Sequence, residues 1–167
     1  AMEIRLVERS NDYASAHYAW RNQPTFKQFN PVDPVDYQTF FYRLQARSSD
    51  LSEFTKHSYF DWYIECDGEV IGNILMKEIN HVMKTAEIGY GISVEHYGRG
   101  ITTRALQLFV DMIFSQTDLR KIIAHVHVGN NGSFRVLEKN GFKREGVLRE
   151  HFIVEGKPYD HYYYGLL

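Results

Sequence analysis

The chain has 167 residues, of which 44% are hydrophobic, 15% aromatic and 24% charged. This composition is ordinary for one globular domain, and we expect a single domain over residues 2–167 that buries about 70% of its unfolded surface. The formal net charge of −2 argues against a general binder of nucleic acids or anionic membranes, because such proteins need a basic surplus.

Cys66 is the only cysteine, so no intramolecular disulfide is possible and no oxidising compartment is required. It lies in an apolar, strand-like run, where we expect a buried structural thiol and not a nucleophile. No apolar run approaches the ~20 residues that a membrane span needs. We therefore expect a cytoplasmic protein, monomeric or homodimeric, and interpret Ala1 as a residue left by a tag before Met2.

The first quarter of the chain predicts a strand and two helices. The strand covers residues 3–8, and Ser10 or Asn11 can cap a helix over residues 12–21 that ends before Pro24. After an aromatic segment, Asp33-Pro34 is expected to start a second helix that reaches about residue 47. Two helices joined by an aromatic loop either wall a site or simply cover the core, and both interpretations stay open.

Alternating apolar and polar residues then predict three antiparallel strands. Asp67-Gly68 is the turn of a hairpin between the first two. In the third strand, Glu87 shares a face with Gly89, Gly91 and Ser93. The expected strands cover residues 60–66, 70–76 and 83–94.

A glycine-bearing turn, Gly98-Arg99-Gly100, joins the third of these strands to a helix over residues 99–116. Such a turn directs backbone N–H groups and the positive end of the helix dipole at one point, which suits an anion such as phosphate. A Walker loop is excluded because no lysine follows the glycines, and a dinucleotide fingerprint is excluded because Thr103 stands where a third glycine is needed.

The last third of the chain predicts a strand, a short helix and two further strands. The strand covers residues 121–128, and the helix ends at Asn140 before Gly141. The final strands, 142–148 and 151–166, are expected to join near Arg149-Glu150, with a turn at residues 155–158 inside the last one.

Three motifs, in this order, resemble the GCN5-related N-acetyltransferase (GNAT) superfamily. They are Ala86-Glu87-Ile88-Gly89-Tyr90, then His96-Tyr97-Gly98-Arg99-Gly100-Ile101-Thr102-Thr103, then Asn130-Asn131-Gly132-Ser133 with Leu137-Glu138-Lys139-Asn140-Gly141-Phe142. The chain is also similar to the RimJ and RimL ribosomal-protein branch at Trp20-Arg21-Asn22-Gln23-Pro24 and near Gly156 and Asp160. The resemblance implies an α/β (α+β) fold: a mixed, mostly antiparallel sheet of about seven strands, flanked by about four helices and splayed between the fourth and fifth strands.

The resemblance also implies acetyl-CoA as co-substrate. The family's pyrophosphate-binding pattern falls on residues 97–102, where Gly100 matches the central glycine while Tyr97 and Thr102 depart from the pattern. Asn130 could equally serve only as a helix cap. The implied cofactor-binding residues are Ile92, Ser93 and Val94 for the pantetheine arm, Gly98, Arg99, Gly100, Ile101, Thr102 and Thr103 for the pyrophosphate, and Asn130 and Ser133 for the acetyl end.

No metal site is expected. His125 and His127 alternate on one strand face, but no third ligand lies at a suitable spacing. We interpret these histidines as structural residues or as part of the lining of the substrate site.

Glu87 is the candidate catalytic base. In the resembling family, the glutamate of a matching Ala-Glu-Ile sequence removes a proton from the incoming ammonium, which otherwise has no lone pair for attack. The alternative is a glutamate that binds the amine by charge alone or pairs with a lysine. The general acid is less clear, because Leu137 stands where many members carry a tyrosine. Either Ser133 hydrogen-bonds the leaving thiolate, or backbone donors and the helix dipole assist it.

These features together predict an N-acetyltransferase that transfers the acetyl group of acetyl-CoA directly to a primary amine. No serine or cysteine lies in a nucleophile motif, so no acyl-enzyme is expected. The expected acceptor is a protein N-terminal α-amine. The alternatives are a small amine, such as a polyamine, amino sugar or antibiotic, and a non-catalytic CoA-binding module.

Overall fold

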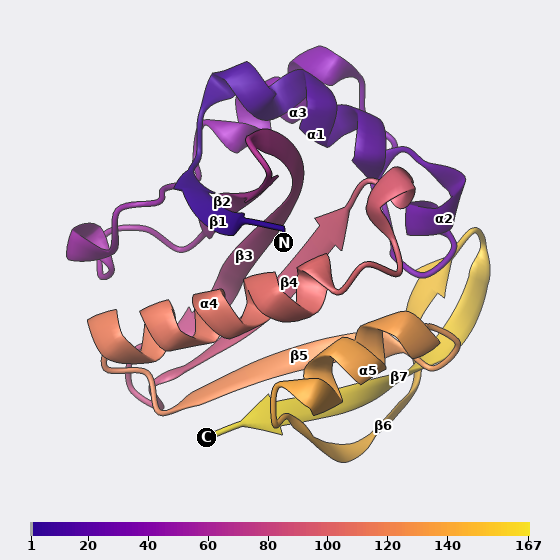
Figure 1. The fold of residues 1–167 in the computed structure, drawn as a ribbon. Coiled ribbons are helices and arrows are strands. Elements are labelled where there is room, and N and C mark those ends of the chain that lie inside the picture. The colour runs from indigo at the N-terminus through magenta and orange to yellow at the C-terminus, as the bar shows by residue number, and fades with distance from the viewer. Residues whose placement is uncertain (1) are drawn as a thin grey trace.

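A twisted sheet of seven strands, in the order β1-β2-β3-β4-β5-β7-β6, organises the part of the chain that the computed structural model describes, residues 2–167 (Figure 1). Neighbouring strands are antiparallel except β4 and β5, which are parallel. Ala1, interpreted above as a tag residue, lies outside the described residues. The strands are β1 (Ile4–Glu8), β2 (Phe60–Cys66), β3 (Glu69–Asn80), β4 (Thr85–Ile92), β5 (Lys121–His127), β6 (Lys143–Val154) and β7 (Lys157–Leu166).

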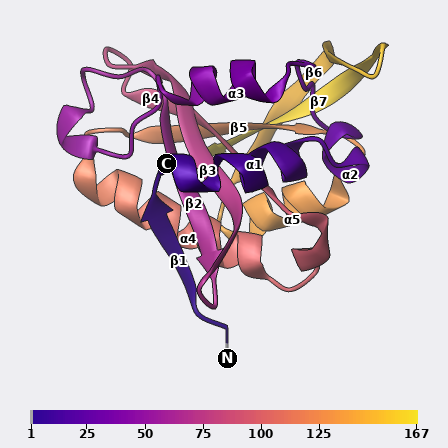
Figure 2. The ribbon, with the colours of Figure 1, turned by 90° about the horizontal axis from the view of Figure 1, so that it is seen from above.

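Helices cover both faces of this sheet (Figures 1 and 2). On one face, Trp62 of β2 packs against Phe109 of α4. On the other, Tyr63 hydrogen-bonds His17 of α1, with 2.9 Å between the phenol oxygen and Nδ1. The helices are α1 (Ala14–Arg21), α2 (Pro24–Lys27), α3 (Tyr37–Leu44), α4 (Ile101–Gln116) and α5 (Asn131–Lys139), with single 3₁₀ turns η1 (Asn11–Tyr13), η2 (Leu51–Glu53) and η3 (Val94–His96).

The mixed, mostly antiparallel sheet expected from the sequence is confirmed, and so is its splay. β4 and β5 pair only over Thr85, Ala86 and Glu87 of β4, and beyond these residues the two strands part. Residues 2–167 contain five α-helices where about four were expected, because Pro24–Lys27 forms a turn of helix with proline at its start. Cys66 is buried, as predicted.

Several element boundaries differ from the sequence predictions, for local reasons. α3 begins at Tyr37 and not near Pro34, because the Asp36 carboxylate accepts a hydrogen bond from the Thr39 N–H at 2.8 Å and caps the helix there. β4 ends at Ile92, and Val94 already belongs to η3.

The junction of the last two strands was predicted wrongly. β6 continues to Val154, and the tight turn to β7 lies at Glu155-Gly156, where both residues have positive φ. Arg149 and Glu150 instead form an irregularity inside β6, where the register with β7 shifts. β6 is an edge strand with mostly exposed side chains, so its polar residues resemble a loop in sequence.

The sheet is buried most deeply at β2, which is covered on both faces. Asp61 of β2 is fully buried, and its carboxylate accepts a hydrogen bond from the Arg47 guanidinium at 2.7 Å. Burial raises the pKa of Asp61, whereas Arg47 beside it lowers that pKa. No helix within residues 2–167 is long and apolar enough to cross a membrane.

Candidate active site

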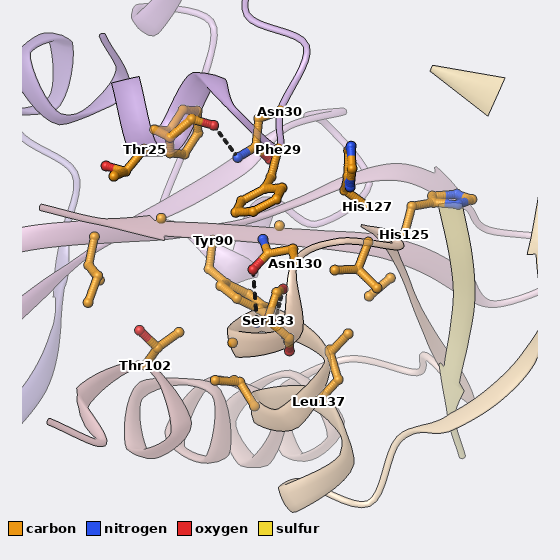
Figure 3. A pocket seen from close by; sticks show the side chains of 18 of the residues that line it. Thr25, Phe29, Asn30, Tyr90, Thr102, His125, His127, Asn130, Ser133 and Leu137 are labelled. Atoms are coloured by element: carbon orange, nitrogen blue, oxygen red, sulfur yellow. Dashed lines mark hydrogen bonds between the residues drawn. The ribbon is translucent and has the colours of Figure 1, made fainter. Parts of the chain in front are cut away.

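A cavity of about 330 Å³ opens where β4 and β5 part (Figure 3). Residues 88–92 of β4 form one wall and residues 124–127 of β5 form the other. The start of α4, helix α5, the segment around α2 and His161 of β7 complete the lining. The cavity therefore joins the predicted anion site at the start of α4 to the two histidines of β5.

The start of α4 presents a row of free backbone donors. Gly98 and Gly100 both have φ of +76°, which turns the chain sharply before the helix. No side chain caps α4, and within residues 2–167 the N–H groups of residues 98–103 have no hydrogen-bond partner. Gly98 and Thr102 line the cavity, so these donors lie at its edge. This arrangement is a site for an anion such as a pyrophosphate.

The two arginines of this segment add positive charge without filling the turn. The Arg104 guanidinium donates to Gln107 Oε1 on the helix surface at 2.8 Å. Arg99 extends toward the sulfur of Met2 at 3.3 Å. The anion site is therefore formed by backbone N–H groups, because both arginine side chains contact other parts of the protein.

In the segment expected to bind pantetheine, residues 92–94, two backbone N–H groups are already hydrogen-bonded within the protein. The Ser93 N–H donates to the Ile71 carbonyl at 2.8 Å, and the Val94 N–H donates to Gln23 Oε1 at 2.9 Å. Ile92 lines the cavity, together with the preceding four residues of β4. Because β5 has diverged there, the unpaired edge of β4 over residues 88–92 is the stretch that an extended ligand could pair with.

Gly91 is needed for the shape of this wall. A Cβ atom at Gly91 would lie 2.6 Å from the Phe26 ring, so the ring could not approach the strand if this residue had a side chain. Phe26 belongs to α2 and lines the cavity. The aromatic segment between the two predicted helices, which are α1 and α3 in the structure, therefore walls the site, and this resolves one alternative left open by the sequence.

Ser133 lies in the first turn of α5 and meets Tyr90 from β4. Their hydroxyl oxygens are 2.9 Å apart, and the Asn130 side chain accepts a hydrogen bond from the Ser133 N–H at 3.2 Å, so Asn130 does cap α5 (Figure 3). Burial raises the pKa of Tyr90 well above its ordinary value, so the phenol stays protonated. The sequence analysis gave Tyr90 no role beyond its place in the Ala86–Tyr90 motif and missed this contact. Leu137 lines the same cavity but offers no donor.

Glu87 and His125 form a half-buried pair across the end of the β4–β5 ladder. Glu87 Oε1 lies 3.2 Å from His125 Nε2, and the side chains are 17% and 18% exposed. Burial raises the pKa of Glu87 and lowers that of His125. Both shifts disfavour the doubly charged pair, so near pH 7 a neutral His125 ring lies in contact with the Glu87 carboxyl group. His125 itself lines the cavity, whereas Glu87 contacts His125 without lining the cavity.

The other predicted residues surround the cavity without all facing it. Ile101 is 1% exposed and packs in the core, so only its backbone is available to a ligand. Within residues 2–167, no group of three or more His, Cys, Asp or Glu is arranged to hold a metal ion. The predicted residues that line the cavity are Ile92, Gly98, Thr102, Asn130 and Ser133, while Glu87, Ser93, Val94, Arg99, Gly100, Ile101 and Thr103 flank it.

Known proteins resemble this chain in sequence and in fold. The family model described as "Acetyltransferase (GNAT) domain" matches residues 2–143. A spermidine N(1)-acetyltransferase of Escherichia coli K12 is 31% identical over 157 residues, covering 93% of this chain and 75% of that protein. A ribosomal-protein-serine acetyltransferase of the same strain is 37% identical over 84 residues, covering 50% and 47%. The structure of Mycobacterium smegmatis RimJ in complex with CoA-disulfide aligns with a TM-score of 0.82 and 26% identity, covering 99% of this chain and 81% of that one.

Proposed function

The chain belongs to the acetyltransferase (GNAT) family and is an acetyl-CoA-dependent N-acetyltransferase, and from this premise we propose that its acceptor is a protein N-terminal α-amine. The observation that carries the proposal is the charge of the cavity wall. Within residues 2–167, no aspartate or glutamate side chain lines the cavity, and Glu87 is the one carboxylate paired with a lining residue across the β4–β5 gap. A single carboxylate near the cavity can balance the charge of one ammonium group, and an N-terminal α-amine supplies one.

The donor would lie along the path that the free backbone groups define. The N–H groups of residues 98–103 would bind the pyrophosphate of CoA. The pantetheine arm would pair with the open edge of β4 over residues 88–92. The thioester would then reach the start of α5, where Asn130 and Ser133 border the cavity.

Glu87 would act as the general base. In the proposed step, the carboxylate takes a proton from the acceptor ammonium, and the amine nitrogen attacks the thioester carbonyl. The C–S bond then breaks, the new amide loses its second proton, and the thiolate gains one. The His125 ring, whose Nε2 lies 3.2 Å from Oε1, would help to hold the carboxylate in place. Holding both substrates in one cavity would supply much of the acceleration.

Ser133 would stabilise the leaving thiolate, with Tyr90 holding the serine hydroxyl. Tyr90→Phe keeps the ring but removes the phenol oxygen that lies 2.9 Å from Ser133 Oγ. We expect kcat to fall about tenfold, the effect of one lost hydrogen bond, while the Kd of CoA is unchanged. The check is steady-state kinetics of Tyr90→Phe, Ser133→Ala and the double variant.

If the two hydroxyls act as a unit, the double variant will be no slower than Ser133→Ala alone. Losses that multiply in the double variant would show that Tyr90 acts independently of Ser133.

A small amine is the second candidate, because the spermidine acetyltransferase relative covers 93% of this chain. A polyamine carries several ammonium groups, however, and a wall without carboxylates leaves all but one of them unpaired. The spermidine acetyltransferase relative therefore supports a small amine as acceptor, whereas the lack of carboxylates in the cavity wall favours an acceptor with one ammonium group.

The test is transfer of a labelled acetyl group from acetyl-CoA to three panels of acceptors: peptides with free N-termini, polyamines and amino sugars. We expect peptides to give the highest kcat/KM, and N-terminally blocked peptides without lysine serve as the control. A kcat/KM for spermidine above that of every peptide would overturn the proposal. Tight CoA binding with no transfer to any amine would favour the non-catalytic CoA-binding alternative.

A further inference from the structure

Two buried histidines beyond the Glu87–His125 pair lack the hydrogen bonds that burial normally requires. His127 of β5 is 7% exposed and His161 of β7 is 4% exposed, and both line the cavity. Within residues 2–167, His127 Nε2 and both ring nitrogens of His161 have no partner. Unpaired buried polar atoms destabilise a fold, so their presence in a cavity wall points to a ligand that pairs with them.

The hydrogen-bonding capacity of the two rings follows from their surroundings. The Gly129 N–H donates to His127 Nδ1 at 2.9 Å, so the proton of the neutral ring is on Nε2, which is a free donor. Burial, reinforced by His127, His125 and His151, lowers the pKa of His161 to about 4. Near pH 7, His161 is therefore neutral and offers one donor and one acceptor.

The walls around the histidine pair are aromatic and uncharged. The Phe29 ring lies 5.2 Å from the His127 ring, centre to centre (Figure 3). The Tyr159 ring lies 4.5 Å from the His127 ring, and the Phe152 ring lies 4.3 Å from that of His161. These neutral rings offer no full charge to pair with a carboxylate, and to a second ammonium group they offer only the weaker attraction of their aromatic faces. A neutral planar group that both accepts and donates hydrogen bonds fits them, and a peptide group has that character.

The spacing along β5 connects this pair to the chemistry. His125 and His127 point to the same face two residues apart, which separates them by about 6.6 Å. Glu87 contacts His125 at the other end of that interval, with 3.2 Å between Oε1 and Nε2. An α-amine held at Glu87 therefore places the first peptide group of its own chain next to His127 and, across the β5–β7 ladder, His161.

We propose that His127 and His161 form a subsite that recognises the first peptide group of the acceptor. The acceptor's carbonyl oxygen accepts the Nε2–H of His127, and its peptide N–H donates to the unprotonated nitrogen of His161. This inference rests on the proposed function, since it specifies how an N-terminal α-amine is told apart from a simple amine. Because the free nitrogens of both rings are buried, the subsite requires the surrounding aromatic rings to move apart when the acceptor binds.

His161→Phe tests the subsite, because it keeps an aromatic ring against Phe152 while removing both nitrogens. We expect KM for a free-N-terminus tetrapeptide to rise about tenfold, with kcat/KM for a simple alkyl monoamine and KM for acetyl-CoA unchanged. Because unpaired buried polar atoms are lost, Tm should also rise, by about 2–4 °C. His81→Phe is the matched control, since His81 is exposed at the turn that follows β3.

The outcomes separate this inference from the proposed function. Wild-type protein that acetylates peptides, together with an unchanged peptide KM in His161→Phe, overturns the subsite alone. Equal losses with peptide and alkylamine also overturn it, because they indicate a structural role for His161. Wild-type protein that acetylates polyamines but no peptide overturns the proposed function, and the subsite with it.

Discussion

Replacing Glu87 with glutamine is expected to lower kcat/KM for the amine acceptor about 10²–10⁴-fold, the usual contribution of a general base. The substitution is nearly isosteric and keeps an oxygen at the position of Oε1, which contacts His125 Nε2 at 3.2 Å. The fold and the binding of CoA should therefore be unaffected. Steady-state kinetics with acetyl-CoA and a peptide acceptor, paired with calorimetry for CoA, measures both quantities.

The pH dependence of the rate distinguishes a Glu87 that acts as general base from a Glu87 that only binds the ammonium by its charge. Burial raises the pKa of Glu87, with Glu78 adding to the shift while Lys77 and His151 oppose it. The base works only when deprotonated, so the wild-type rate falls as pH drops through this raised pKa. Glu87→Gln removes that acid limb. Its residual rate should instead climb toward high pH, where solvent deprotonates the acceptor amine.

Glu69→Gln is a suitable control for Glu87→Gln, because Glu69 is exposed at the hairpin end of β3, away from the cavity. We expect this variant to retain the wild-type kcat/KM and pH profile. If Glu87→Gln is slower but keeps the wild-type profile, the carboxylate only binds the ammonium, and the base is another group.

The features predicted well from the sequence are those that a few consecutive residues determine. Asp67-Gly68 predicts a hairpin because both residues tolerate positive φ, and both adopt it. The turn at Gly98 and Gly100 predicts free amides at a helix start for the same local reason, and these amides have no partner within residues 2–167. Neither prediction needs knowledge of the rest of the fold.

The features that sequence reasoning missed depend on contacts between distant segments. Tyr90 and Ser133 are 43 residues apart, and their contact requires that β4 and α5 lie on either side of the same gap. His127 faces His161 only because β7 lies between β5 and β6 in the sheet. The alternation of apolar and polar residues along a strand predicts which face of the sheet each side chain is on, but it does not predict which strands lie next to each other.

Arg149 shows the opposite error, in which a local signal was misinterpreted. Its polar segment resembles a loop, yet it continues β6 at the exposed edge of the sheet, where polar side chains are ordinary. Val94 is a milder case. The strand pattern continues through it, but Gln23 binds its N–H and the chain turns into η3.

Gly100→Val is expected to weaken CoA binding about 10²–10³-fold, as the loss of two charge-assisted hydrogen bonds would. Gly100 caps α4 with φ of +76° and ψ of 7°, a left-handed conformation that a β-branched residue adopts only at considerable cost. The chain relieves that strain by shifting the turn, which moves the N–H groups of residues 98–103 away from a common point.

Unfolding is not the expected cause of this loss. A Cβ atom at Gly100 would meet nothing within 4 Å, and α4 is anchored by the buried side chains of Ile101 and Ala105. Gly68→Val is a closely matched control, because Gly68 has φ of +85° and equally open surroundings but lies in the β2–β3 hairpin. Calorimetry should show wild-type affinity for CoA in Gly68→Val and strongly reduced affinity in Gly100→Val, with similar unfolding midpoints in urea. Equal affinities in the two variants would mean that the pyrophosphate binds elsewhere.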